Sequence, residues 1–323
     1  IPLYRQEKEW EALGLRLSRA TMSNWLLVVY RDWLVHIVHR LKLELLKQRY
    51  LHIDETHVQV LKEPGRKNTS DSYMWVYCSI RDAVNPIRYF EYQPGRSGKY
   101  PEAFLREYEG YIHTDAYSGY NAVSGVKRCL CYTHLRRAFV DALPKDIHNS
   151  EASKPAEAIL RLNQFFNIES ELEALPPDQK KKERLIREKP LLEAFWSWAE
   201  KSAIGELPKS KLSKAFHYAL NNREGFWNYL EDGNCSISNS LAENCIRPFV
   251  IGRKNWLFSG SPKGAEASAG IYTLVETAKA NGLAPMKYIK YILSDMPGSA
   301  FLEHPEYLDD YLPWNPLVKE FCR

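Results

Sequence analysis

Three acidic residues occupy positions at which carboxylates could hold a metal ion. Asp54 lies inside the apolar segment "LHIDET", Asp115 ends the apolar segment "YIHTD", and Glu243 belongs to "NSLAENCIRPFVIGRKNW" (239–256). A carboxylate in an apolar strand is costly to bury unless a cation or an opposite charge satisfies it. Carboxylate oxygens are the ligands that Mg²⁺ and Mn²⁺ prefer, and such sites leave room for substrate phosphates.

Two such ions, about 4 Å apart, support in-line phosphoryl transfer. One ion would activate a water or a 3′-hydroxyl, and the other would stabilise the leaving oxygen. Asp54, Asp115 and Glu243 are therefore candidates for a catalytic, metal-binding trio. Each acid alone has an ordinary alternative, because an Asp at a strand end often caps a turn and a helical Glu is usually solvated.

Polar neighbours accompany the third acid. Asn239, Glu243 and Arg247 are spaced at intervals of four, which places them on one face of a helix. Asn239 is a candidate for active-site support, and Arg247 could orient Glu243 or bind a phosphate of DNA. The alternative is a surface ion pair between Glu243 and Arg247, worth only roughly 0.3 to 0.5 kcal/mol.

Further cations stand beside these acids in the sequence. Arg253 and Lys254 in "GRKNW" could contact a DNA backbone, and Trp256 could stack on an unpaired base. Trp256 could equally belong to the core. In "CLCYTHLRRAF", Arg136 and Arg137 are candidate phosphate ligands.

The same segment contains Cys131 and His134, separated by two residues, with Cys129 nearby. This spacing resembles half of a zinc site. A second ligand pair with the right spacing is absent, because Cys235 and Cys245 have no patterned partner. We therefore expect no zinc, and His134 could instead form a hydrogen bond within the active site or contact DNA.

The residues that precede the first acid are predicted to be helical. Apolar residues recur at intervals of three and four, Gly14 interrupts the pattern, and Ser18 could cap a second helix. Residues 1–49 are compatible with a helix-turn-helix and equally with a plain helical hairpin. Residues 1–50 hold nine Lys or Arg against five acids, so the net charge of +4 is concentrated there. This bias is a weak indication of a polyanionic partner.

From residue 50 the apolar pattern changes to the alternation that strands show. Predicted strands are "YLHIDETHVQVL" (50–61), "YMWVYCSI" (73–80), "IRYFEY" (87–92), "YIHTD" (111–115) and "KRCLCY" (127–132). Helices are predicted from "SGKYPEAFLREYEG" (97–110) and "THLRRAFVDAL" (133–143). The order is that of an α/β, RNase H-like fold, a mixed sheet flanked by helices. In such a sheet the strands of Asp54 and Asp115 are neighbours.

The remaining chain completes a five-part organisation. After the N-terminal helical region (1–49) and the first part of the catalytic core (50–144), residues 145–233 form an all-helical insertion between the second Asp and the Glu. Residues 234–295 supply the second part of the core, and residues 296–323 a C-terminal extension.

Composition narrows the class of protein. With 45% hydrophobic and 26% charged residues, a 323-residue chain should fold and bury a substantial core. No apolar run approaches the roughly 20 residues that span a bilayer, so we expect no membrane partner. Six cysteines scattered along the chain favour reduced thiols and a cytoplasmic location.

Several ordered segments together resemble the insertion sequence 66 family of bacterial DDE transposases. They are "PLYRQEKEWEALGLRLSRATMSNWL" (2–26), "LHIDET" (51–56), "RYFEYQPGRSGKYPEAFL" (88–105), "YIHTDAYSGYN" (111–121), "CYTHLRRAF" (131–139) and "NSLAENCIRPFVIGRKNWLFSGSPKGAEASAGIYTLVETAKANGL" (239–283). The resemblance extends to about residue 295. One departure is Ser238, where the family usually has Asp, although Ser also caps helices.

The resemblance implies a DNA transposase with an RNase H-like core that nicks element ends and joins the 3′-hydroxyl to target DNA. It places the family's catalytic acids on Asp54, Asp115 and Glu243, with two Mg²⁺ or Mn²⁺ ions, and its Cys-x-x-His signature on Cys131 and His134. It also implies a homo-oligomer on DNA, small accessory proteins of the same element, and a place in the bacterial cytoplasm at the nucleoid.

Two alternatives remain open at this stage. A nuclease or resolvase of the same fold would hydrolyse DNA without forming joined products. A non-catalytic, DNA-binding remnant of a transposase would bind in a salt-sensitive way that depends neither on Mg²⁺ nor on Glu243.

Overall fold

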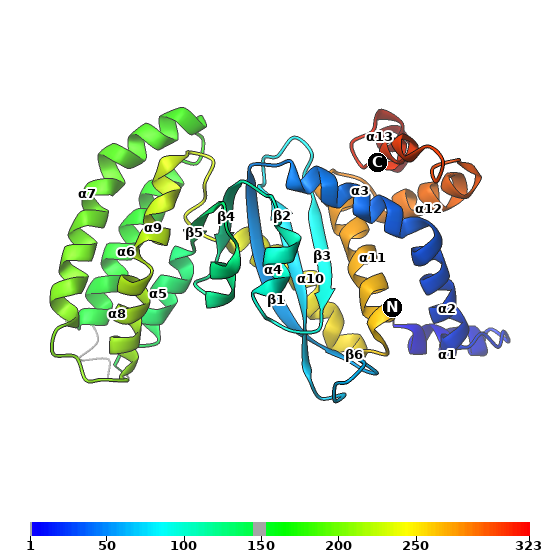
Figure 1. Cartoon of the computed structure of the whole chain (residues 1–323), viewed down its shortest axis with the longest axis horizontal. Coiled ribbons are helices and arrows are strands. Elements are labelled where there is room, and N and C mark those ends of the chain that lie inside the picture. The colour runs from blue at the N-terminus through cyan, green and yellow to red at the C-terminus, as the bar shows by residue number, and fades with distance from the viewer. Residues whose placement is uncertain (1, 145–152) are drawn as a thin grey trace. The chain divides into compact units, whose positions relative to one another are not determined.

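The structure is a computed structural model that describes residues 2–144 and 153–323 (Figure 1). The chain forms two compact units. Unit 1 contains residues 1–48, 52–105 and 241–323, and unit 2 contains residues 49–51 and 106–240. Among the described residues, no helix has the length and apolar character needed to cross a membrane.

Unit 1 begins with helices. They are α1 (Leu3–Ala12), α2 (Arg19–Val29) and α3 (Val35–Leu46), with a π-helical segment, η1 (Tyr30–Leu34), between the last two. Gly14 has a φ of +83°, which suits glycine and turns the chain after α1. Ser18 caps α2 as the sequence predicted, because its Oγ accepts a hydrogen bond of 3.1 Å from the Thr21 amide.

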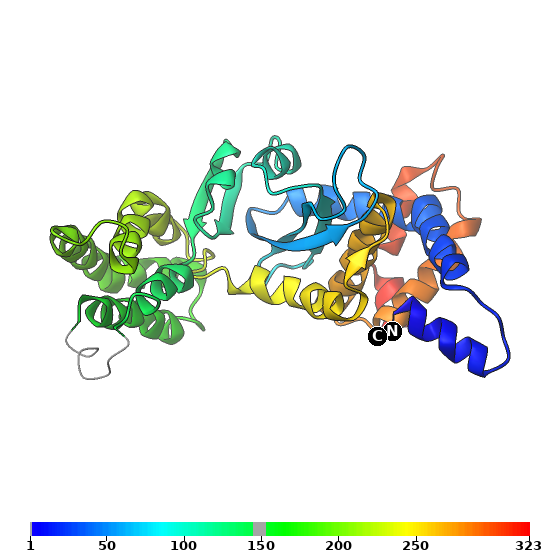
Figure 2. The ribbon, with the colours of Figure 1, turned by 90° about the horizontal axis from the view of Figure 1, so that it is seen from below.

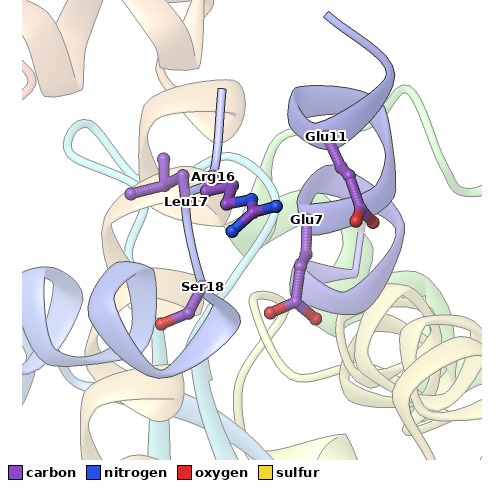
Figure 3. Close-up of a pocket in the computed structure, with 5 residues that line it drawn as sticks. All are labelled: Glu7, Glu11, Arg16, Leu17 and Ser18. Carbon is purple, nitrogen blue, oxygen red and sulfur yellow. The ribbon is translucent and has the colours of Figure 1, made fainter. Parts of the chain in front are cut away.

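A pocket of about 220 Å³ lies between α1 and the segment that enters α2 (Figure 3). Its lining residues are Glu7, Glu11, Arg16, Leu17 and Ser18. Glu7 also accepts a 2.9 Å hydrogen bond from the Arg19 amide at the start of α2. Two helices joined by a glycine turn are thus present, as predicted.

The sheet of unit 1 contains β1 (Tyr50–Val60), β2 (Asp71–Ser79), β3 (Arg88–Gln93) and β6 (Phe258–Ser259). β2 and β3 are antiparallel, with Tyr73 opposite Gln93, and β6 runs parallel to β1, with Phe258 opposite Gln59. The first three strands lie where the alternating sequence pattern predicted them.

Helices α10 (Ser240–Trp256) and α11 (Pro262–Ala280) pack on one face of this sheet, and Figure 2 shows α10 lying along it. On the sheet side, this core contains Val58, Val60, Met74, Val76, Cys78 and Phe90. On the helix side, it contains Ala242, Ile246, Phe249, Ala265 and Ala269. Ala242, Ile246 and Phe249 are spaced at intervals of four and three, so they form one apolar face of α10 toward the strands.

Helix α4 (Lys99–Phe104) packs through Phe104 on Tyr77 of β2, with ring centroids 3.6 Å apart. The sequence pattern predicted a longer helix, over 97–110. The helix ends early because the chain turns after Leu105 and Glu107 adopts a φ of +64°, which an α-helix cannot contain.

The C-terminal part of unit 1 contains α12 (Pro285–Asp295), the short 3₁₀ helices η5 (Met296–Gly298) and η6 (Pro305–Tyr311), and α13 (Pro316–Cys322). A hydrogen bond of 2.7 Å from the Ala284 amide to the Cys322 carbonyl joins the start of α12 to the end of α13. A second bond of 2.8 Å joins the Tyr288 hydroxyl to the Tyr311 carbonyl. The extension is therefore built of short packed helices.

Unit 2 contains two parallel strands and a group of helices. The strands are β4 (Gly110–Thr114) and β5 (Val126–Leu130), with the 3₁₀ helix η2 (Ser118–Ala122) between them. The helices are α5 (Tyr132–Val140), α6 (Lys154–Glu171), α7 (Pro177–Ala203), α8 (Lys211–Asn221), α9 (Arg223–Trp227) and the 3₁₀ helix η4 (Asn228–Glu231). Residues 145–152, the start of the predicted insertion, lie outside the described residues.

Aromatic side chains form the core of the helices in unit 2. Phe139 of α5 packs edge-on against Phe216 of α8 at 5.4 Å, and Phe195 and Trp196 of α7 are buried beside them. The helical character predicted after residue 153 is therefore confirmed.

Strand β1 takes part in both units, since its first two residues belong to unit 2 and the rest to unit 1. The strand order is β3-β2-β1-β4-β5, with β6 beside β1. The predicted mixed sheet with flanking helices is confirmed.

Candidate active site

The first candidate acid, Asp54, lies on the face of β1 that α10 covers. Asp54, Thr56, Val58 and Val60 alternate onto one side of the strand, and the last two are buried in the core beneath α10. Asp54 Oδ1 accepts a 2.9 Å hydrogen bond from the Glu55 amide. Its carboxylate therefore lies at the end of an apolar stripe on this face.

The third candidate acid, Glu243, lies in the first turn of α10 and is half-buried. Cys245, two residues further along α10, can be located on the sheet through Cys78 of β2. Burial and a hydrogen bond with Cys245 raise the pKa of Cys78, and the negative charge of Asp54 adds to the effect. Asp54 and the α10 residue Cys245 therefore both lie near Cys78, within unit 1.

The second candidate acid, Asp115, directly follows β4 in unit 2. Its Oδ1 accepts a 2.9 Å hydrogen bond from the Tyr117 amide, so one carboxylate oxygen caps the turn. Arg128 of β5 holds the backbone of this turn by donating from Nη2 to the carbonyls of Asp115 at 2.6 Å and Tyr117 at 2.8 Å. This contact of Arg128 could not be predicted from the sequence, because Arg128 lies on a strand and in no recognisable motif.

Cys131 follows β5 at the same edge of the strand pair. Its amide donates to the Thr114 carbonyl at 3.1 Å, which extends the pairing of β5 with β4. The carboxyl ends of parallel strands meet at one edge, so Asp115 and Cys131 lie close together. The pKa of Tyr218 in α8 shows the same proximity: burial raises it most, and charge on Asp115 and on Cys131 raises it further.

Two candidate support residues, His134 and Asn239, lie at the starts of α5 and α10, and the amides of both donate hydrogen bonds to Cys131. His134 lies in the first turn of α5, where its amide donates to the Cys131 carbonyl at 3.2 Å. Asn239 is buried and lies directly before α10. The sequence pattern had placed Asn239 within the helix, on the same face as Glu243. The Asn239 amide donates to Cys131 Sγ at 3.1 Å, and this bond ties the start of α10 to the end of β5 within unit 2.

Ser238, just ahead of the helix that carries Glu243, is held by hydrogen bonds. Its amide donates to Ser236 Oγ at 3.2 Å, and its own Oγ lies 3.0 Å from Ser240 Oγ. The helix begins at Ser240.

The candidate DNA-binding residues of α10 differ in exposure. Arg247 and Lys254 are exposed, whereas Arg253 is half-buried, with Nη1 3.4 Å from Thr56 Oγ1 on β1. Trp256 packs edge-on against Phe249 with centroids 5.3 Å apart. This placement of Trp256 favours the core role over stacking on a base.

The two arginines of α5 also differ. Arg136 donates from Nε to Asn163 Oδ1 of α6 at 2.8 Å, so it is bound within unit 2. Arg137 is exposed. Arg137 is therefore the better placed of the two for a phosphate.

One group of possible ligands was not connected by the sequence pattern. His113 of β4, Cys129 of β5 and Cys235 are buried, and one nitrogen or sulfur atom from each lies within 4.8 Å of the others. A hydrogen bond with Cys129 lowers the pKa of Cys235 to about 6, although burial opposes the shift, and a hydrogen bond with His113 lowers it further. Only the fold could reveal this group, because its members are far apart in the sequence.

Comparison with known proteins gives the family. The model of the family described as "Transposase IS66 family" matches residues 1–267. Similar proteins of Sinorhizobium fredii (strain NBRC 101917 / NGR234) include uncharacterized protein y4qI, 28% identical over 98% of this chain and 59% of the relative. Uncharacterized protein y4hP is 26% identical over 97% of this chain and 59% of the relative.

The chain thus spans about three fifths of the length of these relatives. No solved structure matches it. The family model covers well over half of the sequence, so the chain belongs to the IS66 family of transposases.

Proposed function

We propose that this chain carries the catalytic centre of a DDE transposase, which nicks DNA at the element ends and joins the freed 3′-hydroxyl to target DNA. Asp54, Asp115 and Glu243 are the proposed catalytic residues and metal ligands. Their carboxylates form an all-oxygen donor set, which fits Mg²⁺ or Mn²⁺. When bound, two such ions would activate the attacking water or 3′-hydroxyl and stabilise the leaving oxygen.

The register of β1 against β4 within unit 2 is the observation that carries this proposal. The Tyr111 amide donates to the Arg49 carbonyl at 2.8 Å, and the rings of Tyr50 and Tyr111 stack with centroids 5.6 Å apart. Two residues further along both strands, His113 Nδ1 lies 3.2 Å from the Leu51 carbonyl. From the first contact to the second, the residue number rises by two on both strands. The two strands are therefore parallel, with Tyr50 opposite Tyr111.

Four residues beyond this pair come Asp54 on β1 and Asp115 after β4. Residues four apart on a strand point to the same face, so continued pairing would place the two carboxylates side by side. Paired strands lie about 4.8 Å apart, a separation that allows two carboxylates to share a metal ion. This register supports a shared site for Asp54 and Asp115.

Chain connectivity supports the third ligand. Asn239 is held at Cys131, which lies beside Asp115 at the edge of the β4 and β5 strands. Glu243 is four residues beyond Asn239, a distance of about 6 Å along a helix. This short connection supports Glu243 as the third ligand, and within unit 1 the interaction of Cys245 with Cys78 brings this part of α10 near Asp54.

The strand order supports an RNase H-like core. Antiparallel β2 and β3, parallel β4 and β5, and the order β3-β2-β1-β4-β5 fit that fold. Helices α6 to α9 then form the insertion between the second Asp and the Glu. Fold alone does not establish activity, so the carboxylates remain the basis of the proposal.

DNA binding is proposed for the exposed cations and for the N-terminal helices. Arg247 and Lys254 on α10 and Arg137 on α5 are placed to contact phosphates, and Arg253 and Arg136 could contribute donors that their protein partners leave available. Helices α1 and α2 are the proposed helix-turn-helix. Assembly as a homo-oligomer on DNA and small accessory proteins of the same element also remain proposals.

A strand-transfer assay on element-end DNA with Mg²⁺ tests this function. Asp115→Asn and Glu243→Gln should each lower the yield of joined product at least about 100-fold, because a lost ligand removes several kcal/mol of transition-state stabilisation. Glu109→Gln, which changes an exposed acid just before β4, is the matched control and should keep wild-type activity. Circular dichroism checks that each variant folds.

Full activity of Asp115→Asn would refute the assignment. Cleavage without joined products would favour the nuclease alternative. DNA binding with no metal-dependent chemistry, unchanged in Glu243→Gln, would favour the non-catalytic remnant.

A further inference from the structure

Unit 2 brings together three side chains of the kinds that bind zinc. His113 and Cys129 are paired residues in the parallel register of β4 and β5, so their side chains share a face. Cys235 arrives from the segment before α10, and the possible ligand atoms of all three residues lie within 4.8 Å of one another. We propose that His113, Cys129 and Cys235 form a zinc-binding site, separate from the carboxylates assigned to catalysis.

The donor set determines which ion fits. One imidazole and two thiolates suit Zn²⁺, whereas Mg²⁺ prefers oxygen. Tetrahedral zinc with sulfur at about 2.3 Å places two sulfur ligands roughly 3.8 Å apart. The observed spacing therefore needs to contract by no more than about 1 Å, and a fourth position would be left for water.

The His113 ring already has a hydrogen bond that would orient it for zinc, at the ring nitrogen that would not bind the ion. Nδ1 lies 3.2 Å from the Leu51 carbonyl, and Nε2 accepts a 2.8 Å hydrogen bond from the Ser236 amide. The proton is therefore on Nδ1, and Nε2 carries the lone pair. Zinc-binding histidines commonly donate their other ring N–H to a backbone carbonyl in this way. Zinc would take the place of the Ser236 amide hydrogen at Nε2.

The segment that carries Cys235 is held in position before any ion binds. Buried Arg184 donates from Nη2 to the Cys235 carbonyl at 2.8 Å, and the Cys235 amide donates to the Asp232 carbonyl at 3.0 Å. Two residues later, the Ile237 carbonyl accepts a 3.0 Å hydrogen bond from the Tyr132 amide. A ligand fixed in this way loses little conformational freedom on binding.

No sequence pattern predicted this site, because zinc motifs are recognised by short spacings between the ligands. Cys129 and Cys235 are separated by the whole of α5 to α9, and His113 lies on a different strand. The chain also offers an internal comparison, since Cys78 and Cys245 form a second thiol pair, in unit 1. Among the residues that the structure describes, no histidine joins Cys78 and Cys245 in a group that could hold a metal ion.

Metal binding by the full chain, without DNA, tests the proposal. Purified protein is incubated with Zn²⁺, exchanged into metal-free buffer and analysed for zinc content. In parallel it is titrated with Co²⁺, whose thiolate charge-transfer and visible bands report sulfur ligands and tetrahedral geometry. The wild type should retain one equivalent of zinc and show both kinds of band. Hydrogen exchange at the Ser236 amide should become faster with zinc.

Matched variants assign the ligands. Cys129→Ser, Cys235→Ser and His113→Gln should each weaken binding by more than the 10- to 100-fold that loss of a supporting partner costs. Cys245→Ser and Cys131→Ser should still bind one equivalent. Asp115→Asn should also bind zinc normally, so failure of this proposal and failure of the catalytic proposal are distinguishable. Circular dichroism without metal checks the fold of each variant.

Three outcomes would overturn the proposal. The first is a wild type that retains no zinc after buffer exchange. The second is zinc retention by folded Cys129→Ser and Cys235→Ser variants at the wild-type level. The third is loss of zinc from Cys131→Ser or Cys245→Ser with retention in Cys235→Ser, which would place the ion elsewhere.

Discussion

Cys131 Sγ accepts a 3.1 Å hydrogen bond from the backbone amide of Asn239. Cys131 directly follows β5, and Asn239 is the last residue before α10, so within unit 2 this bond holds the end of β5 beside the residue that precedes the helix. Residues separated by the entire helical group of unit 2 are joined in this way. We therefore propose a positioning role for Cys131.

Replacing Cys131 should disturb the start of α10. In Cys131→Ala the buried Asn239 amide loses its acceptor, which should lower the free energy of unfolding by about 1 kcal/mol. Strand transfer should fall about 10- to 100-fold, because small displacements of a catalytic group are costly. Cys131→Ser keeps an acceptor and should recover most of the activity. Equal activity of Cys131→Ala and the wild type would contradict this role.

Arg128 should matter because it holds the turn that contains Asp115. Arg128→Lys cannot keep the donations from Nη2 to the Asp115 and Tyr117 carbonyls together with those from Nε to Thr114 Oγ1 and from Nη1 to Asn121 Oδ1, since a lysine has a single nitrogen. The Mg²⁺ concentration for half-maximal strand transfer should rise about tenfold. Arg106→Lys, at an exposed position in the same unit, is the control and should leave the titration unchanged. An identical Mg²⁺ titration for Arg128→Lys would remove this residue from the site.

Buried Glu188 should make the stability of unit 2 depend on pH. Burial, and then the negative charge of Glu169, raise the pKa of Glu188 to about 7. Between the unfolded value near 4.5 and the folded value, the folded state keeps a proton that the unfolded state has lost. The contribution to stability is therefore complete below pH 4.5 and is lost as the pH rises through 7.

Urea unfolding of the wild type and of Glu188→Gln between pH 4.5 and 8 checks this expectation. The wild type should lose stability across that range, and the variant, which cannot ionise at this position, should show a flatter profile. A profile for Glu188→Gln as steep as that of the wild type would assign the effect to other groups.

Local patterns in the sequence were enough to predict most elements. Alternation and a high content of β-branched and aromatic residues identified the first three strands, and short apolar runs identified β4 and β5. Ser18 was recognised as a helix cap because Ser accepts from the amide three residues later. The helix over 97–110 was predicted too long, because the turn after Leu105 and the positive φ of Glu107 depend on packing and leave no pattern.

Prediction of the candidate site was limited by long-range contacts. Asp54 and Asp115 could be singled out because an acid in or after an apolar strand is unusual, whereas Arg128 acts through backbone carbonyls that no motif records. The meeting of His113 with Cys235 follows from the path of the chain after η4, which only the tertiary structure shows. Trp256 could not be assigned from its type alone, and its packing on Phe249 favours a position in the core.

The central claim, that Asp115 binds the catalytic metal ion, is tested most directly by the ratio of strand-transfer rates in Mn²⁺ and in Mg²⁺ for Asp115→Cys. A thiolate ligand binds Mn²⁺ better than Mg²⁺. The ratio for Asp115→Cys should therefore exceed the wild-type ratio at least about tenfold, with little activity in Mg²⁺. Glu109→Cys should keep the wild-type ratio. An Asp115→Cys variant with the wild-type ratio and wild-type activity in Mg²⁺ would contradict the claim.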